Sequence, residues 1–283
     1  MAGALCTNTH GSGARHTPMP RLVVSMEIVD GEGKLRKIDR KTPGDVLNAV
    51  RISLGCLGII TKVTLQLVTA FDVVVKEHVV TESQFYEQLE SYVRDFEFAK
   101  FWMIPHTGSV VVYEIKKSDT RKGRSSGEAL INSLKGYGME LAQMICAAYP
   151  SLQTFSNKYL LLDNFMKTKY RSGISHEQLI INYRIPYHTE LEYAVPASKA
   201  KSVIKKLQEF LKGGPIQTGF IHEIRFVQND CSWLSTGYTN KSDEEVTEHN
   251  SNVKNLLEEG ELVCHITIGL FSPSFSNLYK YFT

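Results

Sequence analysis

The sequence predicts an α+β fold. Short runs with the period-two alternation of strands are interspersed with longer stretches in which apolar residues recur at helical spacing. Across 283 residues, 42% are hydrophobic and 22% are charged, as expected for a globular protein large enough for two cores. The formal net charge is only +2, so a nucleic acid is not expected as a partner.

The first part of the chain is predicted to be rich in strands. Residues 22–29 and 61–67 alternate in the β-branched manner of strands, and a glycine-containing turn follows the first of them at residues 30–33. Residues 45–53 are expected to form a short helix. The glycines at positions 55 and 58 then allow a tight connection into the next strand, with close backbone packing.

A strand, helix, strand, strand unit is predicted after residue 70. The strand at residues 73–80 leads into Thr81 to Gln84, a capping box, and an apolar stripe of helical spacing continues from there to Phe96. Residues 101–104 and 110–115 are the two following strands.

A second set of elements follows. We expect a long helix at residues 127–149, with Leu141 and Ile145 on its apolar stripe, and strands at 180–185 and 191–195. A helix capped by Ser198 then ends at glycines 213 and 214, and its apolar stripe includes Phe210. The two strand-and-helix units could be a degenerate duplication.

Glu223 and Arg225 are the most informative pair in the sequence. They lie two apart on a predicted strand, so both side chains leave the same face, while Ile224 and His222 leave the opposite, apolar face. The pair is either part of a pocket or a surface ion pair worth about 0–1 kcal/mol. We interpret His222 as a hydrogen-bonded core residue rather than a ligand.

The glycine-containing turn at residues 7–13 is a candidate binding segment. Its backbone N–H groups are able to approach a phosphate or a flavin, although a plain glycine loop has the same pattern. A Rossmann fingerprint, a Walker sequence and a His-Glu-x-x-His motif are all absent. The five cysteines are widely spaced, so we expect reduced thiols and no metal site.

Several segments together resemble one family. They are similar, in family order, to sugar-1,4-lactone oxidases of the vanillyl-alcohol-oxidase-type FAD superfamily, namely L-gulonolactone and D-arabinono-1,4-lactone oxidases; the segments are residues 2–13, 23–29, 53–65, 101–107 and 223–226, followed by Asp230, Trp233, Leu234 and Ser235. The resemblance implies that residues 1–72 are the C-terminal half of a flavin domain. Residues 73–283 would be an α+β substrate (cap) domain with an antiparallel sheet, incomplete at its end.

The resemblance also implies an activity and a set of site residues. An FAD-dependent enzyme would oxidise the CH-OH group of an aldono-1,4-lactone to an ascorbate-type product, passing electrons to oxygen or another acceptor. Glu223 would hold the reacting hydroxyl and Arg225 would stabilise developing negative charge. His265 would be a pocket histidine. The implied cofactor-binding residues are Thr9, His10, Gly11, Ser12, Gly58, Ile59 and Ile60.

Three expectations qualify this reading. Relatives carry an earlier pyrophosphate loop and a closing His-Trp-x-Lys segment, so the chain is expected to be truncated at both ends. Asn8 stands where the family commonly has glycine, which would strain the turn if φ is positive. A truncated, non-catalytic paralogue without FAD and a flavin-dependent 2-hydroxy acid dehydrogenase remain alternatives.

The resemblance and the residues themselves lead to different expected locations. The resemblance implies association with an endoplasmic-reticulum-type membrane, through a region outside this sequence or through a peripheral surface. The residues themselves contain no signal peptide and no apolar run of about 18 residues, so this chain alone is predicted to be soluble.

Overall fold

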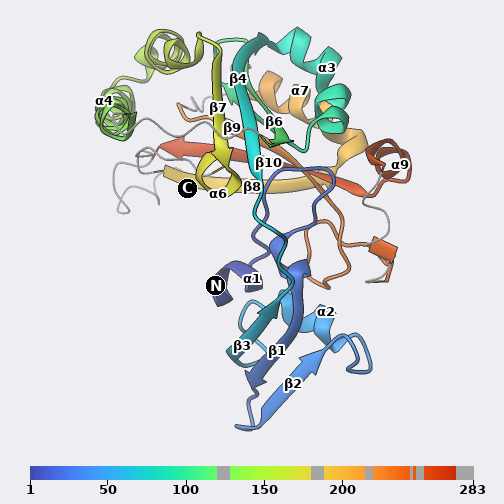
Figure 1. The fold of residues 1–283 in the computed structure, drawn as a ribbon. Helices are drawn as coiled ribbons and strands as arrows, with labels where there is room; N and C mark the ends of the chain where they lie inside the picture. Colours follow the sequence, from blue (N-terminus) through green and yellow to red (C-terminus); the bar gives the residue numbers. More distant parts are fainter. Residues whose placement is uncertain (120–127, 180–187, 214–218, 243–244, 247–251, 272–283) are drawn as a thin grey trace. The chain divides into compact units, whose positions relative to one another are not determined.

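The computed structural model describes residues 1–119, 128–179, 188–213, 219–242, 245–246 and 252–271 (Figure 1). The strand expected at residues 180–185 lies outside them. The chain divides into two compact units. The first comprises Met1–Thr69, Pro196–Ser198 and Phe226–Cys264, and the second comprises Ala70–Val195, Lys199–Arg225 and His265–Thr283. The assignment of residues 1–72 to a flavin domain and 73–283 to a substrate domain stays a prediction.

The first unit is built on a three-stranded antiparallel sheet of order β2-β1-β3 (Figure 1). Its strands are β1 (Val23–Val29), β2 (Leu35–Asp39) and β3 (Ile59–Leu65). The strands expected at 22–29 and 61–67 are confirmed within two residues at each end. β2 was not predicted, because its burial pattern leaves only one residue, Ile38, in the core and so gives no alternation.

Short helices complete the first unit. They are α1 (Ala2–Cys6), the 3₁₀ turn η1 (Met19–Leu22), α2 (Val46–Arg51) and α9 (Val253–Glu258). Leu5 of α1 and Leu47 of α2 pack with Val23 and Met26 of β1 in one apolar core. The helix expected at residues 45–53 is therefore confirmed as α2.

The second unit contains most of a seven-stranded sheet of order β7-β4-β6-β5-β9-β10-β8. Five of these strands, from β7 to β9 in that order, pair antiparallel. The strands are β4 (Asp72–Thr81), β5 (Phe98–Ile104), β6 (Ser109–Ser118), β7 (Lys169–Ile174), β8 (His188–Pro196), β9 (His222–Gln228) and β10 (Leu262–Phe271).

The strand order supports the expected duplication. One unit reads β4, then α3 (Glu82–Asp95), β5 and β6, and the other reads β8, then α7 (Ala197–Gly213), β9 and β10. In the sheet the two units appear as β4-β6-β5 and β9-β10-β8, so the order is palindromic about the β5–β9 pair. Two related units joined through equivalent strands give this order.

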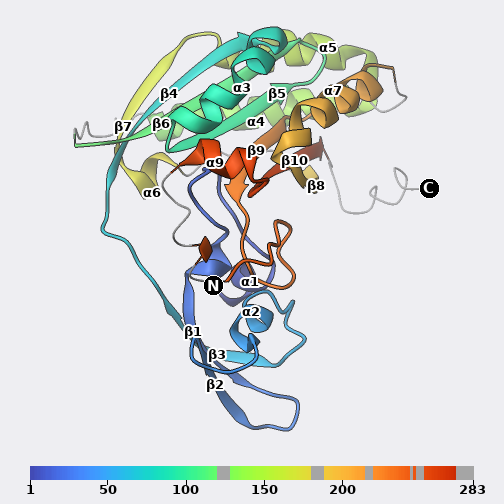
Figure 2. The same cartoon turned by 90° about the vertical axis from the view of Figure 1, so that its right-hand side faces the viewer.

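One face of this sheet is covered by α3 and α7 (Figure 2). The ring of Phe85 on α3 meets Phe101 of β5 edge-on, with centroids 5.1 Å apart. From α7, the Gln208 amide lies 3.3 Å from Nδ1 of His222 on β9. The capping box is confirmed: Thr81 accepts from the Gln84 backbone, and the Gln84 side chain accepts from the Thr81 backbone.

The opposite face carries a second apolar cluster. Trp102 and Ile104 of β5, Val111 and Tyr113 of β6 and Leu161 are among its buried members. The segment that supplies Leu161 contains α4 (Glu128–Ala148), η2 (Pro150–Leu152), α5 (Gln153–Ser156), η3 (Asn157–Leu161) and η4 (Leu162–Phe165), and α6 (Ser175–Gln178) follows β7. Among the helices of the described residues, none combines the length and the apolarity needed to cross a bilayer.

Three expectations about the helices are wrong. Helix α4 is confirmed, but Leu141 and Ile145 are 60% and 45% exposed, while Gln143 and Cys146 face inward. On α7, Phe210 is likewise exposed. Helix α7 begins at Ala197, so Ser198 lies inside it and is not its cap.

Candidate functional site

Glu223 and Arg225 project from the same face of β9, as the alternation predicted. Ile224 between them is fully buried against the other face, and each charged side chain keeps about a fifth of its surface exposed, at 21% and 20%. Arg225 Nε lies 3.5 Å from Glu223 Oε2. The pair is thus held together at the edge of the apolar cluster rather than extended into solvent.

The neighbouring strand β5 fixes the Glu223 carboxylate. Trp102 is the register partner of Glu223, and directly opposite residues share a face. The indole Nε1 of Trp102 donates a 3.0 Å hydrogen bond to Glu223 Oε1. One carboxylate oxygen therefore meets the indole and the other meets Arg225.

Strands β8 and β10 supply the other half of the cluster. Arg225 Nη2 donates to Oε2 of Glu192 on β8 at 2.5 Å and to Oγ1 of Thr267 on β10 at 3.4 Å. The Thr267 hydroxyl donates to the same Glu192 oxygen at 2.8 Å. The guanidinium is thereby oriented by two carboxylates and a hydroxyl.

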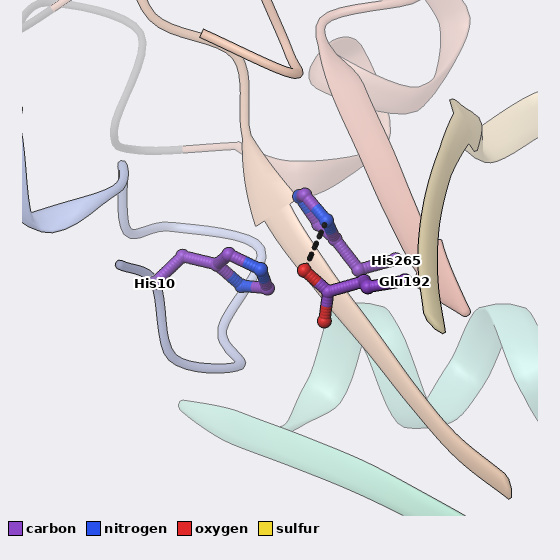
Figure 3. Close-up of side chains that lie close together, drawn as sticks. All are labelled: His10, Glu192 and His265. Carbon is purple, nitrogen blue, oxygen red and sulfur yellow. Dashed lines mark ion pairs between the residues drawn. The ribbon is translucent and has the colours of Figure 1, made fainter. Parts of the chain in front are cut away.

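The buried His265 joins this cluster through Glu192. Its Nδ1 lies 3.4 Å from Glu192 Oε1, an ion pair when the ring is protonated (Figure 3). His265 is only 1% exposed, and Thr267 follows two residues later on the same face of β10. The structure therefore brings together Glu223, Arg225 and His265, three residues that the sequence singled out.

Glu192 and Thr267 were missed by the sequence reasoning. Thr267 could have been found, because it lies two residues from His265 on a strand and must share its face. Glu192 carried only a weak signal, since its strand mixes exposed and half-buried residues and has no fully buried face. Their roles emerge only from the strand order, in which β10 lies beside β9 and β8 lies beside β10.

His222, which lies on β9 with Glu223 and Arg225, is a core residue. It is 1% exposed, and Gln208 is its hydrogen-bond partner. Burial, reinforced by the nearby His106, lowers the pKa of His222 to about 4, so the ring is neutral near pH 7. This agrees with the interpretation of His222 as a structural residue.

The first unit contains an open hollow of about 370 Å³. It is lined by Ala2, Gly3, Cys6, Thr7, Leu54, Gly55, Gly58, Ile59 and Ile60. Three of the predicted cofactor-binding residues, Gly58, Ile59 and Ile60, thus lie in one wall. Helix α1, which supplies other lining residues, was not predicted from the sequence.

Gly58 has a structural reason of its own. Its φ is +141°, and an added Cβ would overlap the carbonyl oxygen of Val29 on β1. The close backbone packing expected at this helix-to-strand connection is therefore present. A packing role and a binding role at this position are compatible.

The other predicted cofactor residues, Thr9 to Ser12, follow α1 and do not line this hollow. The Thr9 N–H donates to the Ala4 carbonyl at 3.0 Å, so it is committed to the end of the helix. His10 Nδ1 lies 3.0 Å from the Gly11 carbonyl oxygen. A phosphate would find the Thr9 N–H already occupied, and the role of this turn stays a prediction.

Asn8, at the start of the same turn, adopts a φ of +58°. Asparagine tolerates this left-handed region better than most residues. Its amide nitrogen donates to the Thr236 hydroxyl at 2.9 Å, which helps to hold the conformation. The condition under which Asn8 was expected to strain the turn, a positive φ, is therefore met.

Comparison with solved structures shows the fold. A histidine-to-alanine mutant of cholesterol oxidase from Brevibacterium sterolicum matches with a TM-score of 0.68 at 16% identity, covering 99% of this chain and 59% of that one. A second structure of the cholesterol oxidase from that organism gives a TM-score of 0.67 at 15% identity. At these identities the likeness concerns architecture alone.

Curated relatives share sequence over most of this chain. L-gulonolactone oxidase of Mus musculus is 26% identical over 238 residues, which are 83% of this chain and 53% of that protein. L-gulono-1,4-lactone dehydrogenase of Mycobacterium tuberculosis is 25% identical over 240 residues, or 84% of this chain and 55% of that protein. The chain spans about half the length of these relatives.

A fungal relative and a family profile complete the comparison. D-arabinono-1,4-lactone oxidase of Debaryomyces hansenii is 32% identical over 118 residues, covering 42% of this chain and 21% of that protein. The sequence model of the D-arabinono-1,4-lactone oxidase family matches residues 63–279, which include Glu223, Arg225 and His265. The chain therefore belongs to the D-arabinono-1,4-lactone oxidase family.

Proposed function

We propose that the protein oxidises an aldono-1,4-lactone of the L-gulono or D-arabinono type to an ascorbate-type product, with FAD as cofactor and oxygen as electron acceptor. Family membership supports the reaction class. The observation that carries the proposal is the carboxylate and guanidinium pair of Glu223 and Arg225, whose positions are fixed by Trp102, Glu192 and Thr267.

The pair has the chemistry that this oxidation requires. Oxidation of a carbinol removes a hydride from carbon and a proton from the hydroxyl group. Glu223 offers a carboxylate oxygen to the hydroxyl proton, and Arg225 offers N–H donors to the oxygen on which negative charge develops. FAD, when bound, supplies the hydride acceptor.

The residues around Arg225 hold its guanidinium in one orientation. Glu192 and Thr267 both contact Nη2, and Glu223 contacts Nε. A guanidinium fixed on two sides loses little freedom when it meets an anionic oxygen, so its stabilising effect needs little reorganisation. Thr267 and Glu192 act as positioning residues in this proposal, and His265 holds the second oxygen of Glu192.

The hollow of the first unit fits part of a flavin cofactor. An added Cβ at Gly3 or Gly55 would meet no atom within 4 Å, so bare backbone borders open space there. Gly58, Ile59 and Ile60 would contact the cofactor through main-chain atoms. Thr9, His10, Gly11 and Ser12 would lie along another part of it, and Gly11 likewise borders open space.

Two measurements test the proposal. The purified chain would be titrated with FAD and its visible absorption recorded, and turnover of L-gulono- and D-arabinono-1,4-lactone would be compared with that of 2-hydroxy acids using an artificial acceptor. Lactone turnover that is lost in Glu223→Gln is the expected result. A chain that stays colourless and inactive would instead match a non-catalytic paralogue. A preference for 2-hydroxy acids would show that these, and not lactones, are the substrate class. Peripheral membrane association stays a prediction of the resemblance.

A further inference from the structure

A row of polar residues crosses five strands beside the candidate site. Register places Lys169 of β7 opposite Glu77 of β4, Glu77 opposite Tyr113 of β6, Tyr113 opposite Lys100 of β5, and Lys100 opposite Arg225 of β9. Directly opposite residues share a face, so all five side chains lie on the side of the sheet that carries Trp102 and Glu223. Lys100 is the member nearest the candidate site that no proposed chemistry uses.

The ammonium of Lys100 rests on two aromatic rings. Its Nζ lies 4.7 Å from the centroid of Trp102 and 4.7 Å from that of Tyr113. The two rings meet edge-on with centroids 4.9 Å apart, so they form a corner that holds the cation. The Trp102 ring is therefore bound at its face by Lys100 and at its Nε1 by Glu223.

This arrangement links Lys100 to Glu223 through one rigid ring. A cation at the face of an indole withdraws electron density and makes the N–H a stronger donor. The same contact restrains the ring orientation, and hence the direction in which Nε1 points. Because Arg225 holds the other carboxylate oxygen, the position of Glu223 depends on both Trp102 and Arg225.

We propose that Lys100 is a positioning residue for Glu223, acting through the indole ring of Trp102. Its catalytic consequence rests on the proposed function of Glu223, whereas the physical link between the three side chains does not. Packing alone gives no reason for a lysine at this position, because burial disfavours its charged form. Its position over the Trp102 ring lets the charge restrain the indole that binds Glu223.

The charged groups facing Lys100 make the link measurable. Burial lowers the pKa of Lys100 from the ordinary value of 10.5; Glu223 and Glu77 oppose the shift, and Arg171 and Arg225 add to it. The proton on Nζ therefore leaves at lower pH than in an ordinary lysine. Removing the Glu223 charge must lower the pKa of Lys100 further, because an attractive neighbour is lost.

Tryptophan emission responds to this proton, because Lys100 lies over the Trp102 ring. The chain has two tryptophans, Trp102 and Trp233, and Trp233 is 54% exposed. A Trp233→Phe variant therefore emits from Trp102 alone. We expect its emission to change with a midpoint below pH 10.5, and to lose this transition in Lys100→Met and in Lys100→Arg. The arginine variant should keep the emission of the charged form at every pH, which separates the cation from packing.

Glu223→Gln in the same background tests the coupling to the site. The midpoint should move to lower pH, whereas the exposed Glu32→Gln should leave it unchanged. A transition that survives in Lys100→Met, or a midpoint that Glu223→Gln does not move, would overturn the proposal. Far-ultraviolet circular dichroism tests whether each variant is folded. If Lys100→Met does not fold, Lys100→Arg alone tests whether the transition depends on Lys100.

A kinetic measurement then separates this proposal from the proposed function. In flavin-loaded protein, Lys100→Met should lower kcat roughly 10-fold to 100-fold with a smaller change in KM, and Lys100→Arg should recover part of the loss. If emission shows the coupling but no lactone is turned over, the proposed function fails and the link stands. If the unmodified protein, Lys100→Met and Lys100→Arg all turn over lactone equally well, the positioning role of Lys100 fails and the proposed function stands.

Discussion

The indole nitrogen of Trp102 lies 3.0 Å from Oε1 of Glu223, across the central strand pair β5–β9. This hydrogen bond joins the two halves of the palindromic sheet at the proposed substrate-binding residue. Since the acceptor is a carboxylate, the bond is charge-assisted and stronger than a neutral one. The position of the carboxylate therefore depends on a residue more than a hundred positions away in sequence.

Replacing Trp102 by Phe should impair the site more than the fold. The ring is retained in smaller form, but the donor to Glu223 is lost, which costs about 1.5–3 kcal/mol for a bond to a charged group. We expect lactone kcat/KM to fall roughly 10-fold to 100-fold, measured by steady-state kinetics. The Trp233→Phe variant is the control and should leave kcat/KM unchanged. Equal losses in both variants would contradict a specific role for Trp102.

Glu192→Gln should weaken the hold on Arg225 and His265 together. The amide keeps the size of the side chain but removes the charge that pairs with Arg225 Nη2 and with His265 Nδ1. A roughly 10-fold or larger loss of kcat/KM is expected, because an oriented guanidinium is worth several hydrogen bonds to a developing charge.

The matched control is Glu190→Gln on the same strand. It removes an equal charge two residues away, from a carboxylate whose hydrogen-bond partner is His188 at 3.0 Å. Its effect on kcat/KM should be much smaller. Similar losses in the two variants would mean that net charge, rather than contact with Arg225, governs the site.

His222 should make the stability of the fold depend on pH between about 6.5 and about 4. Its pKa is lowered to about 4 in the folded protein, whereas the ordinary value is 6.5. As pH falls through this window the unfolded chain takes up a proton that the folded chain does not. The free energy of unfolding should therefore decrease by roughly 3 kcal/mol and then level off below pH 4.

Urea unfolding at a series of pH values measures this dependence. In His222→Gln the titrating group is absent, so the slope between pH 6.5 and pH 4 should become shallower even if the variant is less stable throughout. An unchanged slope would assign the pH dependence to other groups. His176, on the short helix α6, offers a control histidine: His176→Gln should leave the slope as it is.

The alternation of β9 was enough to predict which face His222, Ile224, Glu223 and Arg225 each occupy. Ile224 and His222 lie inward, and Glu223 and Arg225 share the other face, because a strand permits no other arrangement once one face is buried. The partners of that pair were beyond prediction. Trp102 and Glu192 approach through strand order and register, which are set by contacts between distant segments.

Helix α4 illustrates the opposite outcome. Its helical period is plain in the sequence, yet Leu141 and Ile145 are exposed and Gln143 is buried, with its amide donating to the Gly219 carbonyl at 3.1 Å. Periodicity identifies a helix but does not say which neighbours it meets. The turn at residues 7–13 has a related problem: its glycines suggested a binding loop, whereas α1 before it supplies a wall of the hollow.

Gly58→Ala should destabilise the first unit. The new Cβ would overlap the Val29 carbonyl oxygen, and alanine would have to adopt a φ of +141°. A loss of about 2 kcal/mol or more in the free energy of unfolding is expected from the strained backbone alone. Urea unfolding of the purified variant measures it. A fully stable Gly58→Ala protein would show that β1 and the connection before β3 do not pack as described.

Gly11→Ala is the matched control, because an added Cβ there meets no atom within 4 Å and φ is not in the left-handed region. Its stability should stay within about 0.5 kcal/mol of the parent. If Gly11 borders the cofactor as proposed, the same methyl group should still weaken FAD binding, measured by titration of the visible absorption. A stable variant with weakened binding separates a cofactor contact from a folding requirement, and unchanged FAD affinity would remove Gly11 from the proposed binding residues.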